Sequence, residues 1–230
     1  MGDNILTMIK VIELPIDKDM GGLTSYVLQL YRMIDKKEFE LTLLSYDDSQ
    51  NFDVNYNVET VSRPYHIIQF YKKMKCLLSE EKNIIHFHQS YVNIIPILIA
   101  KLAGFKTIIL HAHSSSIDDN RKIVRFLKTG LHKVGRFLLP YLVDTYIGCS
   151  TKASEWMFPR KCIDSDSYYL LHNAIDLDLY DRNINLGLEI RQKFNIPKDA
   201  LVVGHIGRFT PVKNHPFIID IFKEVLKQNP

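Results

Sequence analysis

The chain has 230 residues, of which 46% are hydrophobic and 24% charged, and its formal net charge is +3. These values are ordinary for a globular protein and exclude the disordered and collagen-like classes. The positive charge is too small to indicate nucleic-acid binding. Three cysteines without metal-type spacing favour a reducing compartment. There is no signal-peptide pattern and no apolar run of roughly 18 residues, so we expect a soluble cytoplasmic protein.

Strand and helix patterns alternate along most of the chain. An apolar strand over residues 8–14 is followed by Gly21-Gly22 and by apolar residues at helical spacing from Leu23 to Ile34. Further strands are predicted over 39–44, 83–88, 106–113 and 141–150. Helices are predicted over 94–102 and around 153–156, the second with Ser150 as its N-cap. This alternation predicts an α/β fold with a Rossmann-like, doubly wound parallel sheet.

The last part of the chain predicts the start of a second α/β unit. Residues 176–191 are polar and rich in turn-forming residues, so we place the domain boundary there, with a first domain over 1–183 and a second from 184 to 230. Residues 201–203 predict a short buried strand, and residues 216–226 a helix. The unpaired N–H groups and dipole of a helix N-terminus favour an anion. Arg208 and Lys213 add two positive charges suited to a diphosphate.

Gly21 and Gly22 lie between the first strand and the first helix, where doubly wound folds bind phosphates. Two adjacent glycines let a ligand approach the backbone closely. The alternative is an ordinary tight turn, because the full Gly-x-Gly-x-x-Gly pattern is absent.

Two pairs of histidines, His86 with His88 and His111 with His113, lie near the ends of two predicted strands. A spacing of two places both members of a pair on one face of the sheet. Because open α/β sheets bind ligands at the carboxyl ends of their strands, one of them could orient a sugar hydroxyl or act near a reacting centre. The alternatives are buried structural histidines or a metal site. No acidic or cysteine ligand accompanies the pairs, so we expect no metal.

Residues 121–142 contain six basic residues and no acidic one. Apolar residues recur at helical spacing, with most of the basic residues on the opposite side. The apolar positions are Ile123, Leu127, Leu131, Val134 and Leu138. Such a helix suits an anionic membrane surface. The expected membrane contacts are Arg121, Lys122, Arg125 and Lys128. The alternative is a helix packed on the core with a solvated basic face, and Gly130 and Gly135 weaken a single continuous helix.

Five segments, in order along the chain, carry a resemblance to a known family. They are Gly21-Gly22-Leu23, Ile109-Leu110-His111-Ala112-His113-Ser114-Ser115, Gly148-Cys149-Ser150-Thr151-Lys152-Ala153, His172-Asn173-Ala174-Ile175-Asp176, and Gly204-His205-Ile206-Gly207-Arg208-Phe209 with Lys213-Asn214. Together they resemble the retaining glycosyltransferases of the GT-B fold in the large group 1 class. Within that class the chain is most similar to enzymes of bacterial capsule and exopolysaccharide assembly.

The resemblance implies two Rossmann-like domains across a cleft, the first binding the acceptor and the second most of a nucleotide sugar. It implies that His113 contacts the donor sugar, with His111 as the second choice. Gly21, Gly22, Arg208 and Lys213 would bind the donor diphosphate, and His88 and Ser114 are candidates on the acceptor side. Such enzymes need no metal, because the basic pair and a helix dipole can stabilise the departing diphosphate.

The resemblance therefore predicts transfer of a sugar from a nucleotide-sugar donor to a lipid-linked saccharide acceptor, at the inner face of the cytoplasmic membrane. Residues 201–230 match only the beginning of the second domain and lack its glutamate-containing motif, so we expect an incomplete enzyme. One alternative is a non-catalytic fragment that binds a saccharide or a partner chain. Another is a different enzyme of the same fold, such as a sugar epimerase or phosphorylase.

Overall fold

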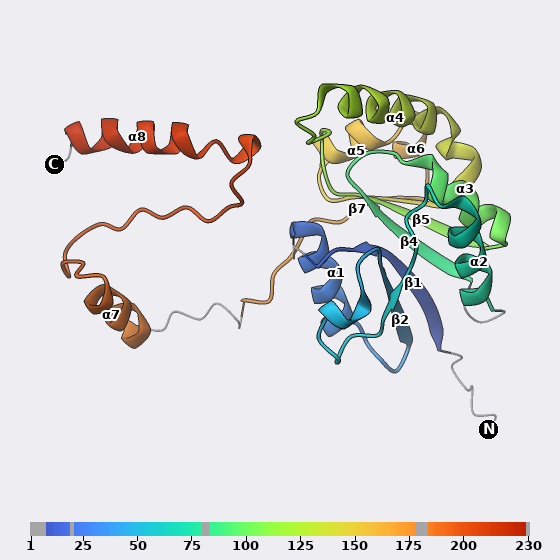
Figure 1. The fold of residues 1–230 in the computed structure, drawn as a ribbon, viewed down its shortest axis with the longest axis horizontal. Coiled ribbons are helices and arrows are strands. Elements are labelled where there is room, and N and C mark those ends of the chain that lie inside the picture. Colours follow the sequence, from blue (N-terminus) through green and yellow to red (C-terminus); the bar gives the residue numbers. More distant parts are fainter. Residues whose placement is uncertain (1–7, 19–20, 80–82, 178–183, 229–230) are drawn as a thin grey trace. The chain divides into compact units, whose positions relative to one another are not determined.

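A computed structural model describes residues 8–18, 21–79, 83–177 and 184–228 (Figure 1). The chain divides into two compact units, the first ending at Ile175 and the second beginning at Asp176. Each unit is described by itself. The domain boundary predicted after residue 183 borders residues outside the described ranges and stays a prediction.

The first unit is built on one sheet of seven parallel strands, in the order β3-β2-β1-β4-β5-β6-β7. The strands are β1 (Ile9–Ile16), β2 (Phe39–Ser45), β3 (Val58–Thr60), β4 (Ile84–Gln89), β5 (Thr107–Ala112), β6 (Thr145–Gly148) and β7 (Tyr168–Leu170). From β1 to β3 each new strand is added on one side of β1, and from β4 to β7 each is added on the other side. The sheet is therefore doubly wound, with its switch point between β1 and β4. The predicted α/β fold is confirmed.

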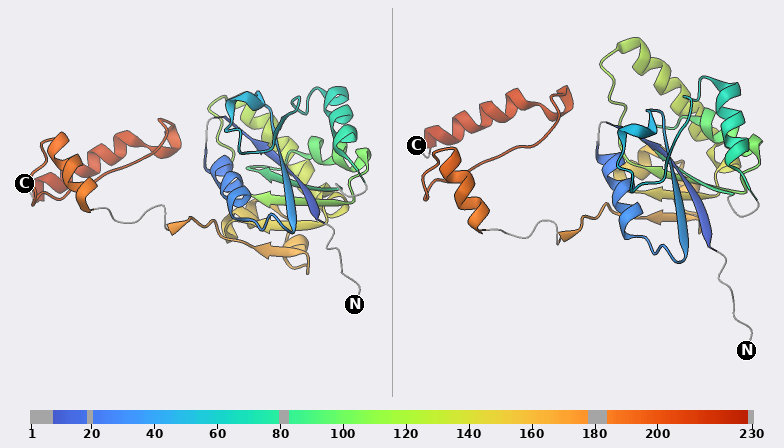
Figure 2. Two further views of the ribbon diagram at one scale, coloured as in Figure 1. Left: turned by 90° about the horizontal axis from the view of Figure 1, so that it is seen from below. Right: turned by 60° about the horizontal axis from the view of Figure 1, so that its bottom comes forward.

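Helices cover both faces of this sheet (Figures 1 and 2). They are α1 (Gly22–Met33), α2 (Ile67–Leu77), α3 (Ile94–Ala103), α4 (Lys122–Leu142), α5 (Thr151–Met157) and α6 (Arg160–Ile163). The larger core joins α2, α3, α4 and α5 to one face, and Ile85 and Phe87 of β4 belong to it. Since side chains alternate along a strand, His86 and His88 lie on the opposite face, where α1 packs on β1 and β2.

Local signals in the sequence explain several of these elements. The side chain of Ser150 accepts a hydrogen bond from the backbone N–H of Ala153 at 3.2 Å, so the predicted N-cap of α5 is confirmed. Gly148, just before this cap, has no room for a side chain, because a Cβ atom there would lie 1.8 Å from Oγ of Ser154. The turn from β6 into α5 therefore requires glycine.

Other expectations were wrong in their extent. The strand predicted over 141–150 is only Thr145–Gly148, because Tyr141 and Leu142 continue α4. The α4 helix is continuous through both of its glycines. Part of the polar segment expected to be a boundary forms α7 (Ile184–Lys193). The short strands β3 and β7 and the helix α2 were not predicted.

The second unit contains α7, a short 3-10 helix (Pro211–Lys213) and α8 (His215–Gln228). The helix predicted over 216–226 is confirmed. The buried strand predicted over 201–203 is wrong: these residues form no strand, and Leu201 is 90% exposed. The described part of this unit contains no strand at all, so a strand over 201–203 would have left its backbone groups unpaired.

Polar contacts hold α4 against the segment around α5. The guanidinium of Arg136 donates hydrogen bonds to the backbone carbonyls of Trp156 and Phe158 at 2.6 and 2.8 Å. His132 accepts from the backbone N–H of Val92 at 3.0 Å. The ring of His132 also stacks on the indole of Trp156, with the centroids 4.2 Å apart. These contacts fix which side of α4 faces the rest of the unit.

Candidate functional site

The candidate site lies on the α1 face of the sheet, at the switch point between β1 and β4. Glu13 of β1 pairs in register with His86 of β4, and His88 pairs with His111 of β5. His113 follows directly after β5, and its ring centroid lies 4.1 Å from that of His111. The structure thus brings together all four histidines at the edge of the sheet where doubly wound folds bind their ligands.

Glu13 is the functional residue that the sequence analysis missed. Its carboxylate is 2% exposed, and one oxygen lies 3.0 Å from Nδ1 of His86 and 2.6 Å from Nε2 of His88. Burial alone would raise the pKa of Glu13, but the interactions with the two histidines lower it to about 2. The available signal was a carboxylate inside an apolar strand, since a buried charge requires a partner.

A second contact extends from this buried group toward His113. Nδ1 of His88 lies 2.9 Å from Nε2 of His113. Burial lowers the pKa of His88 to about 4, and burial together with the neighbouring histidines lowers the pKa of His113 to about 2. Both rings are therefore neutral at neutral pH, and the proton arrangement between them depends on their tautomers.

Tyr26 of α1 packs against the rings of His88, His111 and His113. Its ring centroid lies 5.2 Å from those of His111 and His113, and burial raises the pKa of Tyr26 to about 12. His111 is fully buried, as is His88 at 1% exposure, whereas His113 is half-buried. His113 is thus the one of these three that a ligand can touch directly.

The two glycines predicted to approach a ligand lie at the beginning of α1. Gly21 precedes the helix without a side-chain cap, and a Cβ atom at Gly21 or Gly22 would meet nothing within 4 Å. Tyr26 lies one turn further along α1, so the N-terminus of this helix approaches the surroundings of His113. Ser114, the next residue, donates a hydrogen bond from Oγ to the backbone carbonyl of Ser116 at 3.0 Å.

Three of the histidines lie close enough together to be considered for a metal. Ring nitrogens of His86, His88 and His111 lie within 4.8 Å of one another. Glu13 supplies the acidic neighbour that the sequence analysis held to be absent. Both nitrogens of His88, however, already make hydrogen bonds, to Glu13 and His113. His88 therefore has no free lone pair for a metal, and the cluster as arranged lacks the three protein ligands that a zinc site uses. The absence of a metal stays a prediction.

Arg208 and Lys213 belong to the second unit, and both are exposed. Gly207 lies against the stem of Lys213, whose Cγ and Cδ atoms would be 3.5 Å from a Cβ at that position. Among the described residues the structure shows no ion pair for either side chain. Both lie in the segment before α8, and their contact with a diphosphate stays a prediction.

Comparison with known proteins identifies the family. The family model described as Glycosyltransferase Family 4 matches residues 20–179. The chain belongs to glycosyltransferase family 4. EpsF of Bacillus subtilis (strain 168), which is named as a glycosyltransferase, is 25% identical over 232 residues, covering 92% of this chain and 57% of EpsF.

A second relative of this family 4 chain is the UDP-Gal:alpha-D-GlcNAc-diphosphoundecaprenol alpha-1,3-galactosyltransferase of Escherichia coli. It is 21% identical over 233 residues, covering 96% of this chain and 59% of that enzyme. The chain thus spans less than two thirds of the length of either relative. Among solved structures, UDP-N-acetylglucosamine 2-epimerase from Rickettsia bellii has a TM-score of 0.47 and 13% identity, over 83% of this chain and 52% of the epimerase.

The outward face of α4 in the family 4 chain is apolar, and it includes Ile123, Leu127 and Val134 of the predicted stripe. Large apolar side chains at helical spacing are 58% to 77% exposed. They are Ile123, Phe126, Leu127, Val134, Phe137 and Tyr141. The predicted single stripe is wrong in part, because Leu131 and Leu138 pack against the core instead. No helix in the described part of the chain combines the length and the apolar content needed to cross a membrane.

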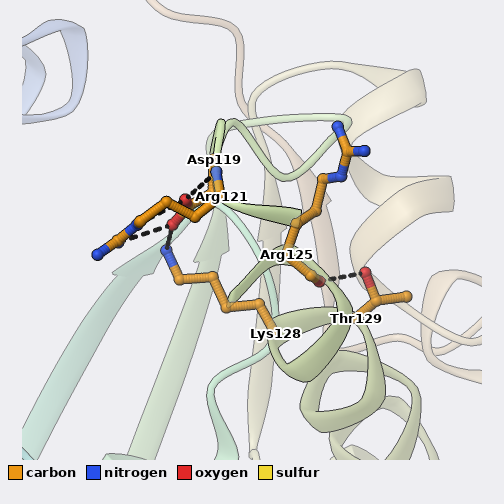
Figure 3. Close-up of polar contacts among 5 residues, drawn as sticks. All are labelled: Asp119, Arg121, Arg125, Lys128 and Thr129. Carbon is orange, nitrogen blue, oxygen red and sulfur yellow. Dashed lines mark hydrogen bonds and ion pairs between the residues drawn. The ribbon is translucent and has the colours of Figure 1, made fainter. Parts of the chain in front are cut away.

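The basic residues predicted to contact a membrane lie in two different situations (Figure 3). Arg121 and Lys128 both pair with Asp119, at 3.1 and 2.8 Å, and these partners hold the pKa of Asp119 well below its usual range. In Figure 3 the guanidinium of Arg125 points away from this group. Lys122 is exposed as well. Among the described residues, the structure shows no ion pair for Lys122 or Arg125, in contrast to Arg121 and Lys128.

Proposed function

We propose that the chain is the acceptor-side part of a retaining glycosyltransferase. The enzyme would transfer a sugar from a nucleotide-diphosphate donor to a lipid-linked saccharide in exopolysaccharide or capsule biosynthesis. Membership of family 4 and the names of the two relatives support this reaction class. The observation that carries the proposal is the convergence of an open glycine-led helix N-terminus and a reachable histidine at the switch point of the sheet.

In this proposal each group has a separate task. The N-terminus of α1, at Gly21 and Gly22, receives the donor diphosphate, because its N–H groups and dipole favour an anion. Arg208 and Lys213 stabilise the negative charge that develops as the diphosphate departs. His113 makes a hydrogen bond to a hydroxyl of the donor sugar. In this proposal, protein groups alone bind the diphosphate and stabilise its charge, without a metal.

Arg208→Ala in the complete enzyme is expected to lower kcat/KM for the donor by at least about tenfold, because a charge-assisted contact contributes about 1.5–3 kcal/mol. Lys213→Ala is expected to act in the same direction. The measurement is release of nucleoside diphosphate at varied donor concentration. Lys223→Ala is the matched control, since Lys223 is an exposed residue of α8 paired with Asp220.

A loss of less than a few-fold in the Arg208 variant would contradict the diphosphate role. The competing function is a non-catalytic fragment that only binds a saccharide or a partner. The 230-residue chain alone separates the two functions: donor turnover comparable with that of full-length relatives would exclude a binding-only role.

We also propose that α4 rests on an anionic membrane, where a lipid-linked acceptor would be found. Its outward apolar side chains can enter the acyl boundary, and Lys122, Arg125 and Lys133, all exposed, can face anionic headgroups. This charge complementarity favours a lipid surface over an uncharged apolar partner. The apolar residues rather than the paired Arg121 and Lys128 are expected to supply most of the binding.

Replacing Phe126 and Phe137 together with serine is expected to weaken vesicle binding by at least about tenfold, because each buried aromatic ring contributes about 1.5–3 kcal/mol. The measurement is flotation with phosphatidylcholine vesicles, with and without phosphatidylglycerol. Val54→Ser is the matched control, since Val54 is 97% exposed and lies outside α4. Equal flotation of the double variant and the unsubstituted chain would refute membrane contact through this face.

A further inference from the structure

Glu13, His88 and His113 form a hydrogen-bonded series that runs from the buried sheet to the accessible edge of the site. They come from the adjacent strands β1 and β4 and from the residue after β5. The successive contacts measure 2.6 Å from Glu13 to Nε2 of His88 and 2.9 Å from Nδ1 of His88 to Nε2 of His113. Glu13 and His88 are almost completely buried, so solvent cannot replace either contact.

The direction of each hydrogen bond follows from what the groups can donate. An ionised carboxylate only accepts, so Nε2 of His88 must carry the proton that faces Glu13. A neutral imidazole has one N–H group, so Nδ1 of His88 accepts. Nε2 of His113 must then donate to it. Nδ1 of His113 is left unprotonated, and the described residues offer it no hydrogen bond.

Packing keeps this arrangement from rotating. The ring of Tyr26 lies against His113 at 5.2 Å and against His88 at 6.0 Å between centroids. The backbone N–H of His113 donates to the carbonyl of Gln89 at 3.0 Å, which extends the pairing of β4 with β5 by one residue. Nδ1 of His86 contacts the same oxygen of Glu13 at 3.0 Å. The carboxylate is therefore fixed independently of His88.

We infer that Glu13 and His88 are positioning residues that hold His113 in its Nε2–H tautomer and present Nδ1 as a hydrogen-bond acceptor. The ligand group that Nδ1 would take is a hydroxyl, and only the identity of that hydroxyl, on the donor sugar, rests on the proposed function. Glu13, acting through His88 and His113, thus determines that the site offers the ligand a hydrogen-bond acceptor. Nδ1 of His113 accepts a hydrogen bond from the ligand and cannot donate one to it.

The test is the tautomeric state of the histidines in the 230-residue chain, read from long-range proton–nitrogen correlations in protein labelled with nitrogen-15. In the unsubstituted chain, His88 and His113 are both expected as Nε2–H tautomers. In Glu13→Gln the new amide can donate to Nε2 of His88, which moves the His88 proton to Nδ1. That proton then faces Nε2 of His113, so His113 is expected to change to its Nδ1–H tautomer.

Glu59→Gln is the matched control, since it removes a carboxylate that pairs with Lys73 near the surface and should leave both tautomers unchanged. A role of Glu13 in folding alone would not move the proton on His113. If Glu13→Gln does not fold, the unsubstituted chain still decides: Nδ1–H on either His88 or His113 overturns the inference.

Two further outcomes are distinguishable. One zinc ion per chain, measured by mass spectrometry on protein purified without chelator, would overturn the inference in favour of a metal bound by the histidine cluster. If the tautomers are as expected but His113→Ala leaves donor turnover of the complete enzyme unchanged, the hydrogen-bonded series stands. In that case the proposed role of His113 at the donor sugar fails.

Discussion

Replacing His88 with phenylalanine is expected to lower the free energy of unfolding by about 3–5 kcal/mol, because it removes one partner of a buried charge. Glu13 would lose its 2.6 Å contact, and His113 would lose its acceptor. His111→Phe at the neighbouring position is expected to change stability by less than about 1.5 kcal/mol. Both ring nitrogens of His111 are buried without a hydrogen-bond partner. Phenylalanine at this position therefore removes two unsatisfied polar atoms and breaks no hydrogen bond.

Urea unfolding followed by far-ultraviolet circular dichroism at neutral pH measures both variants. The two substitutions make the same chemical change at positions that are paired in register on adjacent strands. The comparison therefore removes the general effect of exchanging imidazole for a phenyl ring. Equal losses in the two variants would show that ring packing, and not the contact with Glu13, determines the stability of this region.

Acid is expected to destabilise the first unit steeply, beginning below about pH 6.5. Burial lowers the pKa of His88 to about 4 and that of His113 to about 2, and it lowers the pKa of His111 further still. The unfolded chain takes up these protons near the ordinary histidine value, so the unfolded state is favoured as the pH falls. Each histidine that stays neutral in the folded state contributes about 1.4 kcal/mol per pH unit.

Glu13 acts in the same direction at lower pH. Its folded-state pKa of about 2 lies below the ordinary value of 4.5, so its contribution is present above pH 4.5 and is lost as the pH falls toward 2. Urea midpoints measured between pH 7.5 and 4.5 test the histidine part. His111→Phe removes one of these histidines, so the midpoint should depend less steeply on pH, by the contribution of one proton. A midpoint independent of pH over this range would mean that the folded and unfolded states bind the same number of protons, so that these histidines titrate alike in both states.

The sheet was predictable where its strands are apolar and longer than a few residues, as in β1, β2, β4 and β5. The strands β3 and β7 have only three residues each, too few for a periodic pattern to stand out. The strand predicted over residues 201–203 failed for a different reason. A strand is stable only with neighbours, and the described part of the second unit supplies none.

The site was predictable in its position but not in its internal connections. A spacing of two placed the histidines on one face, and the rule for strand ends placed that face near a ligand. The pairing of Glu13 with His86 depends on which strands are neighbours, and β1 is separated from β4 in sequence by two other strands. On α4 the helical period was readable, but the direction it faces is determined by contacts such as those of Arg136.

The stack of Trp156 on His132 gives the protein an internal optical probe. Trp156 is the single tryptophan of the chain, so its emission comes from one place, the contact between α4 and the segment that bears α5. Burial also lowers the pKa of His132 to about 4, which leaves the stacked imidazole uncharged at neutral pH. Detachment of α4 would expose more of the half-buried indole to water and remove this neighbour. Unlabelled protein can therefore report, in real time, whether the helix stays docked when vesicles are added.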